Sequence, residues 1–385
     1  MPLHFTEQEM ASRRHAAARG LAARGLDGLL MFRQESMYYL TGYDSFGYCF
    51  FQCLYLGADG QTFLLTRLPD LRQAQMTSDI EDIRLWFDAA DADPGRELRN
   101  LLEDLGCRGK QLGIEFDSYG LTAASWRHVE AALDGFCSLE DASDLVSGLR
   151  AVKSPAELEY VRTAAGLADD ALDRAVELAQ PGAFEGDVLA AMHSAIFRGG
   201  GDYAGNEFII GSGDEARLVR YHSGRRNLSD SDQLTLEFAG AYRHYHACLM
   251  RTILTGRPDP AHVDMYKACR EALMACTDAV KPGSTMGDVF GEHARVLDGA
   301  GYREQRFEAC GYGLGAVFTP VWVEQPMLHA GNPLIIVPNM VIFLHMILVD
   351  DDSKRAMTLG HTVIVTETGC EAVSRSSLDL VVNGV

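Results

Sequence analysis

The stretch from Leu234 to Gly256 reads Leu-Thr-Leu-Glu-Phe-Ala-Gly-Ala-Tyr-Arg-His-Tyr-His-Ala-Cys-Leu-Met-Arg-Thr-Ile-Leu-Thr-Gly. Apolar and other residues alternate at its start, which is typical of a half-buried strand. The alternating apolar positions are Leu234, Leu236 and Phe238. Gly240 and Ala241 permit a tight turn, and a second apolar run follows over residues 249–254. The stretch therefore predicts a β-hairpin, around which the rest of the chain is organised.

The predicted hairpin also carries chemically active side chains, which are Glu237, His244, His246, Cys248 and Arg251. Side chains two residues apart on a strand project to the same face. That rule places Tyr242, His244, His246 and Cys248 on one face. We therefore expect the hairpin to contribute to a functional site.

The length and composition of the chain set its class. Its 385 residues suffice for two domains with full cores, and a hydrophobic share of 47% is ordinary for a soluble protein. No apolar run reaches membrane-spanning length, and the amino terminus lacks a signal segment, so we expect no membrane partner. A formal charge of −20 argues against a nucleic-acid partner, whose binding rests on neutralised phosphates. The nine cysteines form no Cys-x-x-Cys pair, which favours reduced thiols and a cytoplasmic location.

The first 150 residues predict a domain in which strands and helices alternate. Thr6 and Glu9 have the spacing of a capping box, and the helix that they begin should stop near Gly25. Expected strands cover residues 28–32, 61–66 and 112–116, and expected helices cover residues 94–105 and 121–133. This alternation predicts a mixed or parallel sheet covered by helices. Three aromatic residues are predicted to lie in the core of that sheet, namely Tyr38, Tyr39 and Phe50.

A second domain should follow a boundary near residues 147–153. Ser154 can cap a helix that has Pro155 at its first position. Helices are expected over residues 155–178, 185–198, 261–280 and 287–299, with strands around and after them. Three glycines in one later strand, which are Gly311, Gly313 and Gly315, leave room for a ligand. The fold class is therefore α/β (α+β) with two domains.

Several segments resemble the creatinase/prolidase ("pita-bread") family. They are the hairpin with its closing Arg-Thr, the run Ser36-Met-Tyr-Tyr-Leu-Thr-Gly, the run Gly113-Ile-Glu-Phe-Asp, the run Arg150-Ala-Val-Lys-Ser-Pro-Ala-Glu-Leu-Glu, and the strand Val337-Pro-Asn-Met-Val-Ile-Phe-Leu-His. The resemblance implies a creatinase-type amino-terminal domain over residues 1–150 and a pita-bread catalytic domain over residues 151–385. It also implies a homodimer in which the segment around residues 43–48 reaches a partner's active site.

The resemblance identifies five positions where metallopeptidases of this family hold two metal ions. In this chain they are Glu237, Cys248, Tyr312, His345 and Gly360. None of the five is the family's Asp, Asp, His, Glu or Glu, and a dinuclear site needs such bridging carboxylates. We therefore expect no metal and no other cofactor, although Cys, His and Glu could in principle hold one zinc ion.

Metal-free members of the family, creatinase and ectoine hydrolase, cleave C–N bonds other than peptide bonds. The stretch Glu237-Phe-Ala-Gly-Ala-Tyr-Arg-His-Tyr-His-Ala and the run Cys310-Gly-Tyr resemble ectoine hydrolase more closely than creatinase. One departure is Arg220, where ectoine hydrolase has a histidine; His222 lies two residues further on.

Without a metal, a side chain must activate water, and a buried carboxylate with a raised pKa suits that task. We predict Glu237 as the general base, His345 and His361 as proton donors or substrate hydrogen-bond partners, and Tyr312 as an orienting hydroxyl. Arginine grips carboxylates in a bidentate manner, so Arg220 is predicted to hold an acidic substrate. The other predicted substrate contacts are His222, Tyr43, Phe46, His246, Cys248, Arg251 and Trp322. The structural alternatives are an exposed arginine cluster, a core position for His345 and an exposed His361.

Three functions remain open at this point. The first is a metal-independent hydrolase of a small amidine, guanidine or amide that carries a carboxylate. The second is a metal-dependent Xaa-Pro dipeptidase, and the third is a non-catalytic pita-bread protein that binds a ligand.

Overall fold

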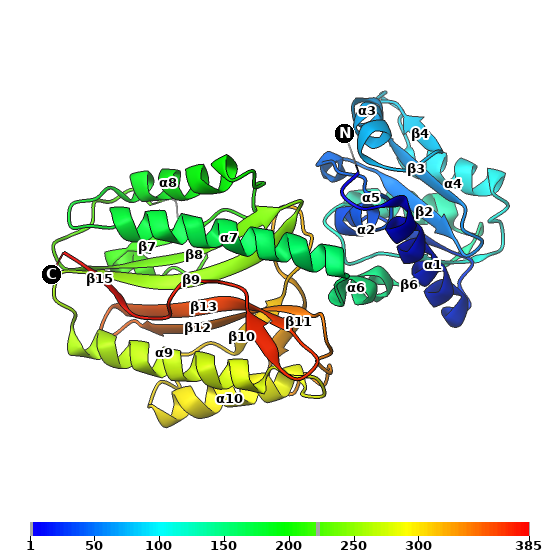
Figure 1. The fold of residues 1–385 in the computed structure, drawn as a ribbon. Helices are drawn as coiled ribbons and strands as arrows, with labels where there is room; N and C mark the ends of the chain where they lie inside the picture. The colour runs from blue at the N-terminus through cyan, green and yellow to red at the C-terminus, as the bar shows by residue number, and fades with distance from the viewer. Residues whose placement is uncertain (1–2, 221–223, 385) are drawn as a thin grey trace. The chain divides into compact units, whose positions relative to one another are not determined.

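The computed structural model describes residues 3–220 and 224–384, and the chain forms two compact units, Met1–Arg150 and Ala151–Val385. The ribbon in Figure 1 shows a sheet with helices in each unit. In the part of the chain that the structure describes, no helix combines the length and the apolar character needed to cross a lipid bilayer.

The first unit is built on a mixed six-stranded sheet in the order β4-β3-β2-β1-β5-β6. Its strands are β1 (Gly28–Met31), β2 (Cys53–Gly57), β3 (Thr62–Arg67), β4 (Ile83–Trp86), β5 (Gln111–Ile114) and β6 (Ser138–Asp141). Its helices are α1 (Glu7–Arg24), α2 (Gln34–Thr41), α3 (Leu68–Thr77), α4 (Pro94–Asp104), α5 (Ala123–Leu133) and α6 (Ser143–Ala151), with a short 3-10 helix η1 (Gly47–Cys49). Two separate hydrophobic clusters fill its core. The predicted alternation of strands and helices is confirmed.

Local signals mark both ends of α1 and the end of α2, where Gly42 adopts the left-handed conformation at φ 80°. The Thr6 hydroxyl accepts a hydrogen bond from the backbone N–H of Glu9, and Gly25 ends the helix in the left-handed conformation at φ 69°. Tyr38 and Tyr39 are buried, but they lie on helix α2 and not on a strand. The predicted burial of both tyrosines is confirmed, and Tyr39 packs in a core cluster with residues of the strands. The prediction was wrong for Phe50, which is 52% exposed.

The second unit contains a nine-stranded sheet whose main path runs β11-β10-β12-β13-β9-β8-β7. Its strands are β7 (Ile209–Ser212), β8 (Asp232–Tyr242), β9 (Tyr245–Thr255), β10 (Ala309–Gly313), β11 (Glu324–His329), β12 (Val341–Asp350), β13 (Arg355–Val365), β14 (Cys370–Ala372) and β15 (Val381–Asn383). Its helices are α7 (Pro155–Leu178), α8 (Glu185–Arg198), α9 (Pro260–Ala279) and α10 (Met286–Gly299), with a 3-10 helix η2 (Gly213–Arg217). The four helices lie within a residue of their predicted bounds.

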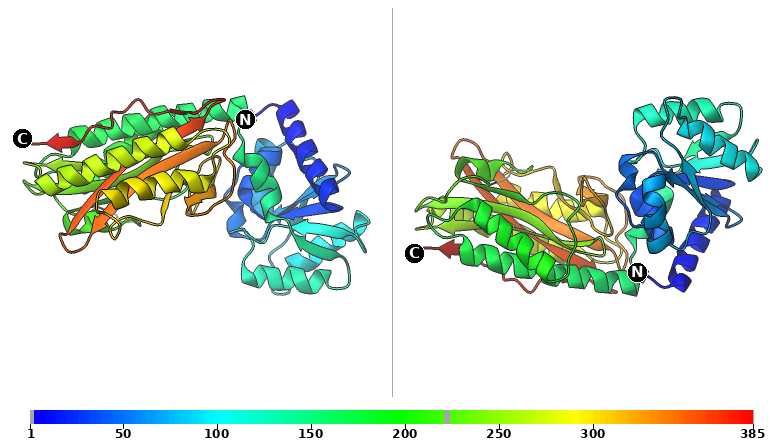
Figure 2. Two further views of the ribbon diagram at one scale, coloured as in Figure 1. Left: turned by 90° about the horizontal axis from the view of Figure 1, so that it is seen from below. Right: turned by 90° about the horizontal axis from the view of Figure 1, so that it is seen from above.

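The helices cover the sheet from outside in two pairs. Seen from below in Figure 2, α9 and α10 lie in front of the strands; seen from above, α7 and α8 do. A Cβ atom added at Gly240 would lie 2.0 Å from the carbonyl oxygen of Ala164, so glycine allows α7 to approach β8 closely. We call the helix-covered side the outer face and the opposite side the inner face.

The predicted hairpin is present, but its turn lies further along the chain than expected. β8 continues through Gly240 to Tyr242, and the turn residues are Arg243 and His244, with φ of 50° and 65°. Two positive φ values in a two-residue loop match the twist of a hairpin. Gly240 and Ala241 are therefore strand residues, and His244 does not share a strand face with His246.

A seam joins the two halves of the sheet between β9 and β13. Only two residue pairs are in register there among the described residues. Threonine side chains continue the bonding on both sides: Thr362 Oγ1 accepts from the Cys248 N–H at 2.8 Å, and Thr252 Oγ1 accepts from the Thr358 N–H at 2.8 Å. Such side-chain bridges allow the sheet to bend where the backbone ladder is short.

Candidate active site

The strand register places all five predicted positions on the inner face. Residues paired across adjacent strands project to the same face. One row of pairs runs from Glu237 through Met250 and Gly360 to His345. The neighbouring row contains the four residues Cys248, Thr362, Phe343 and Tyr312.

Curling of the sheet brings the ends of these rows together. Three strands separate β8 from β10, so a flat sheet would place them roughly 19 Å apart. Nevertheless, the Tyr312 hydroxyl donates to Glu237 Oε1 at 3.1 Å, and the indole Nε1–H of Trp322 donates to the Tyr312 hydroxyl at 2.8 Å. Because the indole occupies the oxygen as an acceptor, the Tyr312 hydrogen is directed at Glu237. The structure thus places Trp322, one of the predicted substrate contacts, behind Tyr312.

The Glu237 carboxylate lies in a strongly desolvated position. The residue is 7% exposed, and burial raises its pKa to about 7 from 4.5. The Tyr312 hydrogen bond and the charge of Arg220 act in the opposite direction and lower that pKa. Glu237 therefore changes its protonation state near neutral pH, as a general base requires.

His345 occupies the far end of the same row and is neutral at pH 7. Burial, together with a smaller effect of the nearby His293, lowers its pKa to about 3. Its ring lies 5.5 Å from the Tyr312 ring and 5.6 Å from the Phe343 ring, measured between centroids. Its Nδ1 atom is buried and has no hydrogen-bond partner among the described residues. A neutral imidazole of this kind suits hydrogen bonding to a ligand better than proton donation as a cation.

The structure does not bring His361 into this cluster. His361 pairs with Leu344, which belongs to the hydrophobic core under α9, so its side chain lies on the outer face. Its Nε2 atom lies 3.1 Å from the Thr277 hydroxyl of α9, and burial lowers its pKa to about 4. The predicted catalytic role of His361 finds no geometric support, since adjacent strand residues project to opposite faces.

Arg251 also lies on the outer face. It donates to the carbonyl oxygens of Met250 at 2.8 Å, Gly360 at 2.7 Å and Ser377 at 3.2 Å. The guanidinium thus ties β9 to β13 behind the row that contains Glu237. Its predicted role as a substrate contact is replaced by a structural one.

His246 and Cys248 project to the inner face but are completely buried. His246 Nε2 accepts from the Gly205 N–H at 2.8 Å, and its Nδ1 lies 3.4 Å from the Gly315 carbonyl oxygen, which satisfies both nitrogens of a neutral ring. Burial raises the pKa of the Cys248 thiol, and the charge of Glu237 adds to that rise. Cys248 is therefore a protonated, buried thiol on the inner face.

The arginine cluster divides into members with different environments. Arg220 and Arg225 are exposed, and the charge of Arg220 acts on Glu237. Arg226 instead holds its own loop, because it donates to Asp232 at 2.9 Å and also to Ser212 and Ser229. His222 lies outside the described residues.

Tyr43 and Phe46 belong to the first unit and differ in exposure. Tyr43 is completely buried, and its hydroxyl donates to Gln52 Oε1 at 3.2 Å. Phe46 is 76% exposed. Of these two predicted substrate contacts, Phe46 is the one whose side chain lies on the surface of the first unit and not in its core.

The five positions do not suit the metal pair of the family. Gly360 has no side-chain donor, and a Cβ atom there would lie 3.0 and 3.1 Å from ring carbons of Phe343. The Phe343 ring thus fills the space next to the fifth position. In the described parts of the chain, no three His, Cys, Asp or Glu side chains form a group that could hold a metal ion.

Three inner-face residues were missed from the sequence, which are Thr235, Met250 and Phe343. The alternation of Leu234, Leu236 and Phe238 indicated one buried face, whereas residues 233–241 of β8 are buried on both faces. For Thr235, the sequence held one signal of an inner-face position: it precedes Glu237 by two residues and therefore shares its strand face.

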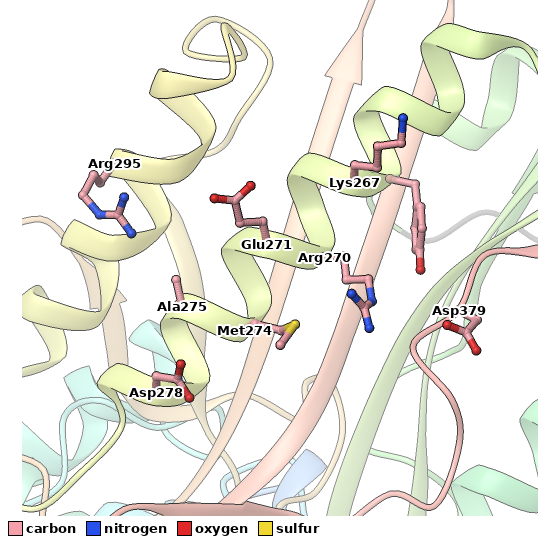
Figure 3. A pocket seen from close by; sticks show the side chains of 9 residues that line it. Lys267, Arg270, Glu271, Met274, Ala275, Asp278, Arg295 and Asp379 are labelled. Carbon is pink, nitrogen blue, oxygen red and sulfur yellow. The ribbon is translucent and has the colours of Figure 1, made fainter.

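A groove on the outside of α9 is a separate surface feature. Figure 3 shows Lys267, Arg270, Glu271 and Asp278 along α9, with Arg295 of α10 and Asp379 on either side. Its charges are mixed in sign, and it lies on the helix side of the sheet. It is therefore distinct from the site around Glu237.

The fold and the site together define the class of this protein. The chain belongs to metallopeptidase family M24, a family of hydrolases, whose model matches residues 159–367. The model of the creatinase/prolidase N-terminal domain matches residues 13–152.

Individual relatives extend over almost the whole chain. The ectoine hydrolase of Halomonas elongata is 27% identical over 390 residues, which covers 97% of this chain and 96% of the relative. The crystal structure of dipeptidase PepE from Mycobacterium ulcerans is 26% identical, with a TM-score of 0.85 over 99% of this chain and 100% of that one. A prolidase from Thermococcus sibiricus shares the fold at 20% identity, with a TM-score of 0.88 over 98% and 100% of the two chains.

Proposed function

We propose that this protein is a metal-independent hydrolase of a C–N bond, other than a peptide bond, in a small amidine, guanidine or amide that carries a carboxylate. The observation that supports this most directly is the buried Glu237, which is hydrogen-bonded to Tyr312 at a position where the family holds metal. Similarity to an ectoine hydrolase over nearly the full length supports the same substrate class.

In the proposed reaction, the Glu237 carboxylate takes a proton from water as the water oxygen bonds to the amidine carbon. The C–N bond then breaks, its electron pair stays on nitrogen, and the protonated Glu237 returns a proton to that nitrogen. The hydroxyl proton of the adduct follows to the amine, which leaves as an ammonium ion. Glu237 thus acts as both base and acid, a task for which a pKa of about 7 is well placed.

The neighbouring groups have supporting roles in this proposal. His345 is neutral, so it hydrogen-bonds the departing nitrogen through its unpartnered Nδ1. Arg220 holds the substrate carboxylate, which is consistent with its exposure and with its electrostatic effect on Glu237.

The test combines metal analysis with a substrate screen. Purified protein is analysed by mass spectrometry for transition metals, and then assayed before and after chelation with ectoine, creatine and other guanidino acids, and Xaa-Pro dipeptides. We expect hydrolysis of an amidine or guanidine that survives chelation. Activity against Xaa-Pro dipeptides that requires a stoichiometric metal would instead identify a dipeptidase. Binding without turnover of any compound would identify the non-catalytic alternative.

Glu237→Gln tests the chemical assignment in the same assay. The amide keeps the shape of the side chain and can still accept from Tyr312, but it cannot take a proton. We expect turnover to fall by about two to four orders of magnitude, which is the usual scale for a general base. Near-normal turnover would place the base elsewhere.

The homodimer and the cytoplasmic location stay predictions. Light scattering at assay concentration checks the first, with the exposed Phe46 as the residue to replace. An active monomer would contradict it.

A further inference from the structure

A buried hydroxyl on the inner face lacks a hydrogen-bond partner. Thr235 is 2% exposed, and its Oγ1 atom has no partner among the described residues. Buried hydroxyls in folded proteins are nearly always hydrogen-bonded, to protein or to ordered water. Valine has the same shape and avoids this cost, so a threonine here needs an explanation.

The position of Thr235 relates it to Glu237. The two residues are two apart on β8 and both project to the inner face. Their Cβ atoms are therefore roughly 7 Å apart, a spacing that a single water molecule can bridge between the two side-chain oxygens. Tyr312 donates to Oε1 of Glu237, which leaves Oε2 for such a molecule.

The other neighbours of Thr235 have their hydrogen bonds satisfied. Thr252, which faces it on β9, is bonded to Thr358 at 3.1 Å. On β7, Thr235 faces Gly211, which has no side chain to bond with it. A Cβ atom at Gly211 would lie 2.7 Å from the Glu215 carbonyl oxygen. Further back along β8, the Gln233 amide donates to the carbonyl oxygens of residues 213 and 354. Among these described residues, Glu237 keeps an acceptor oxygen, Oε2, that no hydrogen bond occupies.

We infer that Thr235 is a positioning residue that holds the attacking water against Glu237. The Thr235 hydroxyl donates to one lone pair of the water, the water donates a proton to the Glu237 carboxylate, and the second lone pair is directed at the substrate carbon. This inference rests on the proposed function, and it adds the direction of attack: water approaches from the Thr235 side, and the departing nitrogen lies toward His345.

Thr235→Val tests the inference, with Thr235→Ser and Thr252→Val as matched controls. Thr235→Val removes only the hydroxyl and should lower kcat by about 10- to 100-fold, with KM and the midpoint of the pH profile unchanged. Its melting temperature should stay close to that of the wild type, because no hydrogen bond to a described protein atom is lost. Thr235→Ser should restore kcat. Thr252→Val should lower the melting temperature and leave kcat unchanged, since the Thr252 hydroxyl is already bonded.

A high-resolution crystal structure separates this inference from the proposed function. We expect an ordered water within hydrogen-bonding distance of both Thr235 and Glu237 in the wild type, and its loss in Thr235→Val. A Thr235 hydroxyl bonded to a protein atom, or kcat of Thr235→Val within twofold of the wild type, would overturn the inference. If no screened compound is hydrolysed, the proposed function fails, and the water position still decides whether Thr235 and Glu237 share a molecule.

Discussion

Glu237→Gln should stabilise the protein, by an amount that depends on pH. Burial raises the Glu237 pKa from 4.5 to about 7, a rise of about 2.5 units. Below pH 4.5 the side chain is protonated in both the folded and the unfolded chain, so the raised pKa does not change the free energy of unfolding. As the pH rises from 4.5 to 7, the unfolded chain loses this proton while the folded chain keeps it, and the free energy of unfolding falls. Above pH 7 both forms are ionised, and the free energy of unfolding falls no further on account of Glu237.

The size of the effect follows from the pKa difference. About 2.5 units at roughly 1.36 kcal/mol each give a cost of about 3 kcal/mol above pH 7. Glutamine does not ionise, and its carbonyl oxygen can accept the Tyr312 hydrogen bond, so the variant escapes this cost. In a domain of this size, about 3 kcal/mol corresponds to a melting temperature roughly 6–12 °C higher.

The assay compares thermal unfolding of the wild type and Glu237→Gln at pH 5 and pH 8. The difference in melting temperature should be small at pH 5 and large at pH 8. The exposed Glu207 provides a control, because Glu207→Gln should leave the melting temperature unchanged at both values. A variant that is less stable than the wild type at pH 8, or a difference that does not vary with pH, would refute the raised pKa. A stabilised but inactive variant would also show that lost activity does not come from unfolding.

Three further predictions concern Tyr312, which is bonded to Glu237, and the outer-face residues Arg251 and His361. Tyr312→Phe removes a bond that lowers the Glu237 pKa, so the acidic limb of the kcat/KM profile should move to higher pH; an unmoved limb contradicts this coupling. Arg251→Met leaves three backbone carbonyls without their donor and should lower the free energy of unfolding by about 2–4 kcal/mol in urea titrations; an unchanged midpoint would show that the seam does not need the guanidinium. His361→Ala should lower stability but keep kcat within about threefold, since a non-catalytic surface of the sheet is altered; a loss of several hundredfold would return His361 to the catalytic residues.

Much of the fold could be predicted because its signals are local. Thr6 and Gly25 mark the ends of α1, and Ser154 with Pro155 marks the start of α7, through backbone hydrogen bonds that involve only nearby residues. The hairpin turn could not be placed in this way. Glycine is common in turns, but Gly240 lies on a strand, where the absence of a side chain lets α7 pack closely against β8. This contact joins residues 164 and 240, so no local pattern reveals it.

The site was predictable in its members and less so in its geometry. Position within a familiar motif identified Glu237, Tyr312 and His345, and the structure places all three on one face. His361 was predicted together with them, yet it lies one residue after the inner-face Gly360, and a shift of one residue on a strand reverses the face. The bond between Tyr312 and Glu237 depends on how far the sheet curls between β10 and β8, which neither strand reveals by itself.

The electrostatics of the inner face explain how the chain tolerates its replaced ligands. A dinuclear site collects several carboxylates, whose mutual repulsion the cations offset. In this chain one carboxylate is kept, and the other four positions carry no negative charge at pH 7: a thiol with a raised pKa at Cys248, a phenol at Tyr312, a neutral imidazole at His345, and Gly360. The remaining Glu237 has a pKa near neutrality, so it too is protonated in part of the population. The set therefore contains no cluster of charged carboxylates whose repulsion a cation would have to offset. Under the proposed function, an approaching cationic amidinium would favour the carboxylate form of Glu237. In the proposed reaction, substrate binding and activation of the base would thus be coupled through the same desolvated side chain.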